Sequence, residues 1–390
     1  MTASRSRLAI IFFTVLIDLI GFGIVVPILP FYAQRFGAQG VGFGGLVFVF
    51  SAMQFLATAL LGRLSDRVGR RPVLLATMVL NAAGYLLFAF AGSYVGLFAA
   101  RVMSGFASGN ISVAQAYVAD ITSAAERARG MGTIGAAFGI GFVAGPLLGG
   151  VAAHYAGELA PGLVAAGLSL ANFISARAIL DESLAPEHRR TRPLFDLAHM
   201  GEAAARPRLR PLMLVWLIAP FAFAGYTVVL PLHTAATFGW TAKHLGWLFG
   251  LIGAIVAVVQ GYVFGRVERR AGPRLLLSAG LFGMAVAVAA LPLAGSSAGI
   301  YLWTVPLALA NSFFAPAATG LVSVYADPTE QGSILGAAQA FAALGRSVGP
   351  LAAGWAYDAL GARAAFFAAG GIMALAGMAS LGLERQAPRR

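Results

Sequence analysis

Long runs of apolar residues, separated by short polar connections, recur along the whole chain of 390 residues. Segments such as 73–91 and 275–293 are continuously apolar, and a helix needs about 20 such residues to cross a hydrocarbon core about 30 Å thick. Backbone groups in lipid must be satisfied internally, so spanning segments are helices or strands of a closed barrel. Barrel strands would alternate apolar and polar positions, and these runs do not. The pattern therefore predicts an all-α membrane protein.

Twelve hydrophobic segments are predicted, and one long polar connection separates six from six. The connection covers residues 181–210, between a predicted N-terminal six-helix bundle at 1–180 and a C-terminal six-helix bundle at 211–390. The twelve segments are 8–31, 41–62, 73–91, 94–119, 130–153, 160–180, 211–234, 244–265, 274–293, 298–324, 332–355 and 363–383.

The two halves share short sequence patterns at nearly constant offsets. An even number of segments in each half makes such halves parallel repeats about an axis normal to the membrane, with a substrate path expected between them near the midplane. The recurring patterns have offsets of 203, 204 and 204 residues: Gly62-Arg63-x5-Gly69 with Gly265-Arg266-x5-Gly272, Gly145-Pro146-x3-Gly150 with Gly349-Pro350-x3-Gly354, and Gly21-x5-Pro27 with Gly225-x5-Pro231.

The net charge of +12 lies mainly in the connections between segments. Connections on the side of the two termini hold 22 of the 27 Lys and Arg residues, and the opposite connections hold three, Arg35, Lys243 and Arg363. By the positive-inside rule both termini are expected in the cytoplasm, and this topology explains the basic charge better than nucleic-acid binding does. The first segment carries Asp18 and no signal-peptide cleavage site, so it is expected to remain as a span.

Several classes of chemistry are disfavoured by composition. The chain has no cysteine, so disulfides and thiolate metal sites are not expected. Its five histidines are scattered, without the spacing of metal ligands. No nucleophile–base pair stands out, so we expect no enzyme, no metal and no cofactor.

Four stretches resemble motifs of one family. The connection GRLSDRVGRRP at 62–72 resembles the cytoplasmic loop signature of the major facilitator superfamily, and RVMSG at 101–105 its fourth-span motif. Residues 141–150, GFVAGPLLGG, are similar to the fifth-span motif typical of antiporters. The first segment, with Asp18-x2-Gly21-x-Gly23-x3-Pro27-x2-Pro30, resembles that of twelve-span drug:proton antiporters, the tetracycline exporters especially. The resemblance covers essentially the whole chain and implies the major facilitator fold, twelve helices in two pseudo-symmetric bundles.

Charged residues inside the segments are candidates for proton coupling. Asp18 lies near mid-bilayer, where a charge costs at least about 2.5–3.5 kcal/mol and where desolvation favours the protonated carboxyl group. Its alternative role is a packing carboxylate bonded to Ser or Asn, but the repeat position is Ala222, which favours proton coupling. Arg101 is interpreted as a fixed cation acting on Asp18, or alternatively as a side chain that reaches the nearer membrane face. For Arg346, in the eleventh segment, a cavity role and contact with cytoplasmic headgroups stay equally open.

Uncharged polar side chains inside the segments are candidates for the substrate cavity. Their ordinary use is interhelical hydrogen bonding, worth about 0.6 kcal/mol each, and most are expected to serve in that way. Gln54, Asn110 and Gln339 are the favoured cavity residues, Gln54 also because it is placed similarly in tetracycline exporters; Asn311 and Gln115 follow. One departure from those exporters is that segments seven to twelve carry no buried acid.

The resemblance also implies a conformational switch in the first cytoplasmic loop. Asp66 would contact the start of the eleventh segment, Arg70 would link it to Asp120, and the clasp would favour the outward-facing state. A topology anchor is the alternative, although Asp66 interrupts the basic cluster that headgroup binding would favour. In the second copy Arg269 replaces Asp66. The residues assigned to the switch are Gly62, Asp66, Arg67, Gly69, Arg70 and Asp120.

The fifth segment carries small residues at helical spacing around a proline. Small residues let helices approach closely, and proline bends a helix. The prediction is a tight, kinked seam against a helix of the other half that prevents proton leak, with generic packing as the alternative. The motif residues are Gly141, Gly145, Pro146, Gly149 and Gly150.

Together these features predict a proton-coupled secondary transporter that exports small, amphipathic compounds, a multidrug or tetracycline-resistance type of antiporter. It is expected as a monomer in a bacterial inner membrane, binding substrate, protons and lipid. One alternative is a proton symporter that imports a nutrient or metabolite on the same fold. A second is a membrane receptor or scaffold without transport activity.

Overall fold

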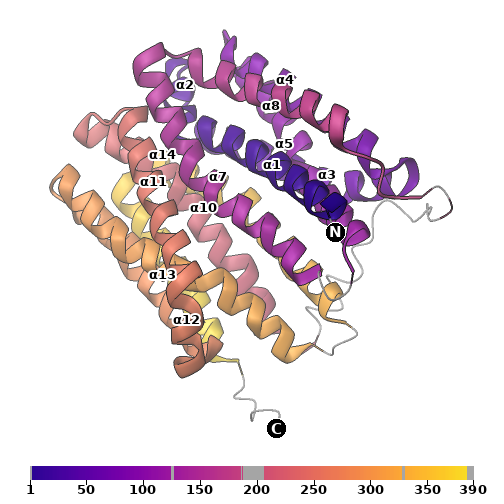
Figure 1. The fold of residues 1–390 in the computed structure, drawn as a ribbon. Helices are drawn as coiled ribbons and strands as arrows, with labels where there is room; N and C mark the ends of the chain where they lie inside the picture. Colours follow the sequence, from indigo (N-terminus) through magenta and orange to yellow (C-terminus); the bar gives the residue numbers. More distant parts are fainter. Residues whose placement is uncertain (1, 124–126, 186, 188–205, 327–329, 384–390) are drawn as a thin grey trace. The chain divides into compact units, whose positions relative to one another are not determined.

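The computed structural model describes residues 2–123, 127–185, 187, 206–326 and 330–383 (Figure 1). Within these ranges all regular secondary structure is helical, which confirms the predicted all-α class. Most of the predicted linker, residues 188–205, lies outside the described residues. The helices are α1 (Thr2–Val25), α2 (Leu29–Arg35), α3 (Gly40–Val68), α4 (Arg70–Ala89), α5 (Tyr94–Ala107), α6 (Ile111–Ile121), α7 (Arg127–Ala156), α8 (Ala160–Ile179), α10 (Arg210–Phe238), α11 (Ala242–Val258), α12 (Phe264–Ala290), α13 (Ser297–Tyr325) and α14 (Gln331–Leu381).

Nine helical segments of the described chain are long and apolar enough to cross a membrane. Two of these segments have 52 and 48 residues, and each contains a glycine with a positive φ, Gly272 at 76° and Gly361 at 82°. The predicted fourth span corresponds to α5 and α6, which meet at a 3-10 turn over Ser108–Asn110. The chain is therefore a multi-pass membrane protein, and the count of twelve crossings stays a prediction.

The chain divides into two compact units, which we describe separately. The first unit comprises Met1–Ala38, Val49–Phe195 and Trp240–Gly253, and the second comprises Gln39–Phe48, Asp196–Gly239 and Ala254–Arg390. The N-terminal part of α3 is thus grouped with the C-terminal half of the sequence, and most of α11 with the N-terminal half. The units follow the predicted halves except at these two helices.

The positive-φ glycines of the described chain reproduce the internal repeat. Left-handed backbone favours glycine because a Cβ atom would clash there. Such glycines mark the same turns in both halves, because their offsets of 202, 203 and 204 residues lie within one residue of those of the sequence motifs. The three pairs are Gly37 with Gly239, Gly69 with Gly272, and Gly157 with Gly361.

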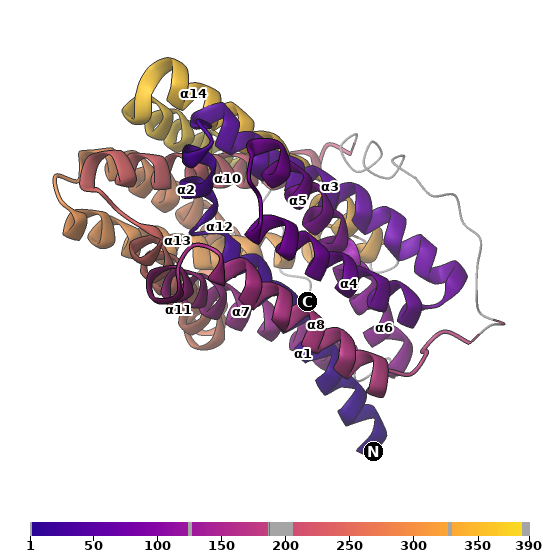
Figure 2. The ribbon, with the colours of Figure 1, turned by 90° about the horizontal axis from the view of Figure 1, so that it is seen from above.

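Each unit is held together by a few long helix pairs. In the first unit α1 packs on α7 and α8, and α4 packs on α5 and α8 (Figures 1 and 2). In the second unit α10 packs on α14, and α12 packs on α13 and α14. The core of the first unit gathers side chains such as Ile11, Met78 and Tyr117, none of which is exposed. This packing brings α1, α4 and the turn after α5 together around Asp18.

Candidate functional site

A 3-10 turn between α5 and α6 positions the partner of Asp18. Gly109, in this turn, lies against α3, where a Cβ atom at this position would come within 2.6 Å of the Ala57 Cβ. Only a residue without a side chain fits there, and the tight approach aims Asn110 inward. The Asn110 Nδ2 atom donates a 2.6 Å hydrogen bond to Asp18 Oδ2, with Asp18 9% and Asn110 3% exposed.

The second carboxylate oxygen of Asp18 is not satisfied in the same way. Oδ1 is buried and has no hydrogen-bond partner among the described residues, and the same is true of both side-chain polar atoms of Asn81. Asn81 lies beside Asp18 and interacts with it, although without a hydrogen bond of ordinary geometry. The Asn81 amide can serve either form of Asp18: its Nδ2 atom can donate to a carboxylate Oδ1, and its carbonyl oxygen can accept from a protonated Oδ1. The site therefore has polar groups suited to both protonation states.

Arg101 and Tyr85 extend this cluster. Arg101 is 4% exposed, and its Cζ atom lies 4.0 Å from the centre of the Phe50 ring. Tyr85, 1% exposed, is close enough to both Asp18 and Arg101 to interact electrostatically with each. The guanidinium group is thus enclosed by protein within the first unit, an arrangement that disfavours the alternative in which Arg101 reaches headgroups.

The repeat copy of this cluster in the second unit is not charged. The turns at Gly69 and Gly272 align α4 with α12. Ser93 and Ser296 each cap a helix by accepting a backbone N–H, and they align α5 with α13. The positions equivalent to Asp18, Asn81 and Arg101 are all less than 3% exposed and are occupied by Ala222, Met284 and Thr304. The fold accommodates these positions without ionisable groups, so folding alone does not account for them in the first unit.

Gln54 makes a hydrogen bond between helices. Its Nε2 atom donates to the Ser108 carbonyl at 3.5 Å, and Gln260 donates to the Ser312 carbonyl at 3.3 Å. Gln260 follows Gln54 by 206 residues and is therefore not its exact repeat position, but a similar glutamine-to-carbonyl bond is present in each half. The bond supports a packing role for Gln54 and adds no support for its predicted cavity role. Of the other predicted cavity residues, Asn110 is buried against Asp18, whereas Asn311 is half-buried and Gln115 and Gln339 are exposed.

The structure brings Asp66, Arg70 and Asp120 together at the end of α3. Arg70 is 7% exposed; its Nη1 atom lies 2.6 Å from Asp66 Oδ1 and its Nε atom 3.1 Å from Asp120 Oδ2. Nη1 also donates to Ser65 Oγ at 2.6 Å. A buried guanidinium between two carboxylates fixes the loop against α6. Gly62 and the exposed Arg67 lie on the same last turns of α3.

The predicted contact between Asp66 and the start of the eleventh segment is not described. The side chains of residues 331–333, which begin that helix, lie outside the described residues. This part of the clasp stays a prediction.

Glu182 belongs to this loop site and was not predicted. Its Oε1 atom accepts from the backbone N–H of Arg70 at 2.8 Å, and its Oε2 atom accepts from that of Arg71 at 3.2 Å. These are the first N–H groups of α4, whose N-cap residue, Gly69, has no side chain to satisfy them. A carboxylate at a helix N-terminus is stabilised by the unpaired N–H groups. No local sequence pattern identifies this acid, because Glu182 follows Arg70 by 112 residues.

The fifth-segment motif contacts two different helices. A Cβ atom at Gly141 would lie 2.6 Å from Leu19 Cβ, and one at Gly145 would lie 2.7 Å from Gly23 Cα. Gly149 approaches the Ile24 carbonyl in the same way. These three glycines therefore face α1, a helix of the same half, and the predicted seam against the other half is wrong for them.

Pro146 and Gly150 make the seam that was predicted. A Cβ atom at Gly246 of α11 would lie 2.6 Å from the Pro146 carbonyl oxygen, and one at Gly150 would lie 3.2 Å from Gly246 Cα. The motif has two contact faces, because glycines spaced by four residues face one helix, while the next residue in each turn faces another.

Comparison with known proteins agrees with this architecture. The chain is 32% identical to the tetracycline resistance protein, class C, of Escherichia coli over 359 residues, 89% of this chain and 89% of that protein. It is 30% identical to human major facilitator superfamily domain-containing protein 10 over 426 residues, 95% of this chain and 91% of that protein. A crystal structure described as the human organic anion transporter MFSD10 (TETRAN) superposes with a TM-score of 0.72 at 28% identity, covering 97% of this chain and 99% of that one. The Major Facilitator Superfamily matches residues 11–311 and 263–390. The chain therefore belongs to the major facilitator superfamily of transporters, as its motifs predicted, and is not an enzyme.

Proposed function

We propose that this protein is a proton-coupled exporter of small, amphipathic compounds, a drug:proton antiporter that works by alternating access. The observation that carries the proposal is the buried Asp18 carboxylate, which has one oxygen bonded to Asn110 and the other without a partner among the described residues. Its repeat position, Ala222, is apolar. The tetracycline resistance proteins among the relatives support the export direction.

In this proposal Asp18 alternates between two protonation states. The Asn110 amide stabilises the carboxylate, and a proton on Oδ1 gives Asn81 a donor. The cation of Arg101 and the hydroxyl of Tyr85 adjust the local field, because both are buried in the same cluster. The proton gradient supplies the energy, so the cycle needs no cofactor or metal.

The proposed setting is a bacterial inner membrane, with both termini in the cytoplasm and the protein acting as a monomer. The distribution of 22 of 27 basic residues to one side supports this orientation. Two six-helix bundles at 1–180 and 211–390, joined by residues 181–210, would move as the alternating halves. The Asp66–Arg70–Asp120 cluster would act as the switch on the cytoplasmic side.

Uphill transport by purified protein in liposomes tests the proposal. Tetracycline is the probe, because relatives are named for resistance to it. An imposed pH gradient should drive tetracycline against its concentration gradient and opposite to the proton flow, and Asp18→Asn should abolish this while Asp18→Glu keeps part of it. Movement in the same direction as protons would instead identify a symporter. If Asp18→Asn keeps wild-type uphill transport, Asp18 is not the coupling residue.

A further inference from the structure

Arg346 lies in the middle of a membrane-spanning helix. The sequence left a cavity role and contact with cytoplasmic headgroups equally open for this residue. In the structure α14 begins at Gln331 and stays helical, with Pro350 inside it, until the non-helical backbone at Gly361. Fifteen residues of helix precede Arg346, a rise of about 22 Å, and fourteen follow before Gly361. Contact with cytoplasmic headgroups therefore requires a distance that an arginine side chain does not cover.

Neighbouring helix contacts define the direction of the Arg346 side chain. Gly349 lies against α10, where a Cβ atom would meet the Phe221 backbone, and Pro350 lies against Gly44 of α3. At about 100° per residue, Arg346 is about 60° from Gly349 on one side and about 40° from Pro350 on the other. Arg346 thus projects between α10 and the N-terminal end of α3, within the second unit.

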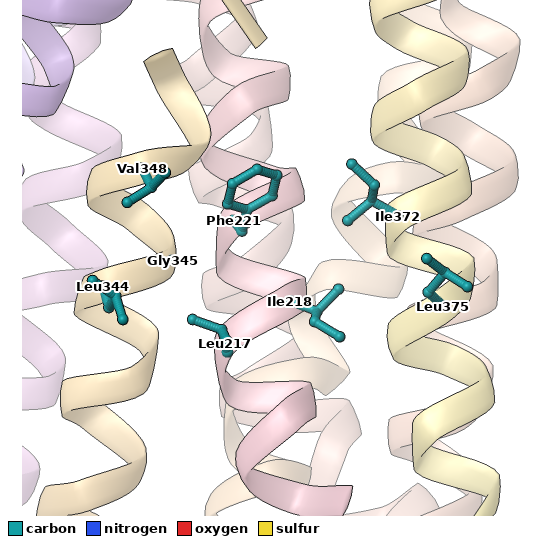
Figure 3. A pocket seen from close by; sticks show the side chains of 8 residues that line it. All are labelled: Leu217, Ile218, Phe221, Leu344, Gly345, Val348, Ile372 and Leu375. Atoms are coloured by element: carbon teal, nitrogen blue, oxygen red, sulfur yellow. The ribbon is translucent and has the colours of Figure 1, made fainter. Parts of the chain in front are cut away.

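The opposite face of α14 is apolar. Leu344 and Val348 border a hollow of about 390 Å³ between α10 and the two parts of α14 (Figure 3). Its wall has no polar lining residue: Leu217, Ile218, Phe221, Leu344, Gly345, Val348, Ile372 and Leu375. This face suits lipid chains, and both Leu344 and Val348 are more than 40% exposed. Arg346 lies about 160° around the helix from both Leu344 and Val348, so it points away from this apolar face.

Arg346 has no protein counter-charge among the described residues. It is exposed, and no hydrogen bond, ion pair or aromatic contact joins it to any described residue. The predicted segments seven to twelve contain no buried acid. The repeat position in the first unit is Phe142, so the helix pair does not require a cation here. An arginine at this depth is costly unless an anion or a polar cavity compensates it.

We propose that Arg346 binds an anionic group, a carboxylate or sulfonate, of the transported amphipathic compound. The proposal rests on the transport function proposed above and specifies its substrate class. The planar guanidinium group can donate two parallel hydrogen bonds to such a group, and Gln339, two turns earlier on the same face and also exposed, can bind a neutral polar group of the same compound. The substrate is therefore an amphipathic organic anion.

Equilibrium binding to purified protein, without any gradient, tests this assignment. Three naphthalene compounds differ only in the polar group: 2-naphthoate, 2-naphthamide and 2-naphthylmethylammonium. The wild type should bind the anion at least about tenfold more tightly than the amide, which corresponds to about 1.4 kcal/mol. R346Q should remove this preference, R346K should keep part of it, and Q339L should weaken anion and amide alike.

Two controls separate loss of charge from loss of fold and from loss of transport. Arg363→Gln, an arginine outside the helix face considered, should keep the full preference, and the thermal midpoint of R346Q should match the wild type. Equal affinities for anion and amide in the wild type, or a preference that survives R346Q, would overturn the assignment. Because binding is measured without a gradient, such a result leaves uphill tetracycline transport, and with it the proposed function, unaffected.

Discussion

The carboxylate of Asp358 accepts a 2.7 Å hydrogen bond from the backbone N–H of Val41, 317 residues away in the sequence. Asp358 thereby caps the beginning of α3 within the second unit. The repeat position in the first unit is His154, whose Nε2 atom lies 3.3 Å from Nζ of Lys243 at the beginning of α11. Both halves therefore use the end of the glycine-proline helix to hold the first turn of a helix from the other half of the sequence.

Removing the Asp358 cap should loosen the start of α3. Loss of an N-cap costs about 0.5–2 kcal/mol, so Asp358→Ala should speed local opening about two- to thirtyfold. Hydrogen exchange of the amides at residues 41–44 measures this. Asp358→Asn keeps an acceptor oxygen, so its exchange rate should lie between those of the wild type and Asp358→Ala.

The repeat provides a matched control. His154→Asp introduces at α11 the residue that caps α3, next to Lys243, and should slow exchange at residues 242–246. If this variant speeds exchange there, the two helix starts are not equivalent.

Arg101 should tolerate lysine better than alanine. Lysine keeps a cation near the Phe50 ring but loses the planar guanidinium that stacks on it. Transport by Arg101→Lys should therefore exceed that by Arg101→Ala, and both should shift the pH optimum. Phe50→Leu should lower transport more in the wild type than in Arg101→Ala, because in the alanine variant the Phe50 ring has no cation to bind. An alanine variant with normal transport and an unchanged optimum would show that Arg101 has no part in coupling.

The hydrophobic pattern predicted the helices because apolar runs of membrane length leave the backbone few alternatives. It did not predict which helix each face would meet. Gly141 and Pro146 belong to one motif but face α1 and α11, and the sequence spacing does not distinguish these partners. The glycine turns at 69 and 272 were recognised as repeats from their spacing.

Residues outside the motifs were harder to assign. Glu182 reaches α4 only because the chain returns after α8, so a local pattern could not identify it as a cap. A polar residue inside a span can line a cavity or bond another helix, and the sequence does not distinguish these roles for Gln54. Its bond to the Ser108 carbonyl depends on the 3-10 turn after α5. Arg346 could not be oriented until the contacts of Gly349 and Pro350 were known.

The exposed pair between Arg206 and Glu330 should make stability depend on acidity. Two Arg206 nitrogens lie 2.5 and 3.1 Å from the Glu330 carboxylate oxygens, and these hydrogen bonds and the Arg206 charge lower the pKa of Glu330. A lowered folded pKa contributes stability that is present above the unfolded value of about 4.3 and is lost as the pH falls through the folded value.

Thermal unfolding of wild type and Glu330→Gln from pH 3 to 7 measures this contribution. The difference between them should be small at pH 7, because the pair is exposed, and should disappear toward pH 3. It should also shrink in 1 M salt. A difference that persists at pH 3 would assign the effect of the variant to something other than the ion pair.

Asp66 should act on the balance of conformations and not on substrate binding. Its pair with Arg70, which is only 8% exposed at the side chain, and the proposed contact with the eleventh segment would together stabilise the outward-facing state by about 1–2 kcal/mol. Asp66→Asn should then shift the equilibrium toward the inward-facing state about five- to thirtyfold, slowing turnover while substrate affinity of the inward-facing form stays nearly unchanged. Arg269 occupies the repeat position of Asp66 but is not an acid, so Arg269→Ala should change the conformational equilibrium much less. A distance probe between the ends of α2 and α10 reports the populations directly, and unchanged distances in Asp66→Asn would leave the loop as a topology anchor only.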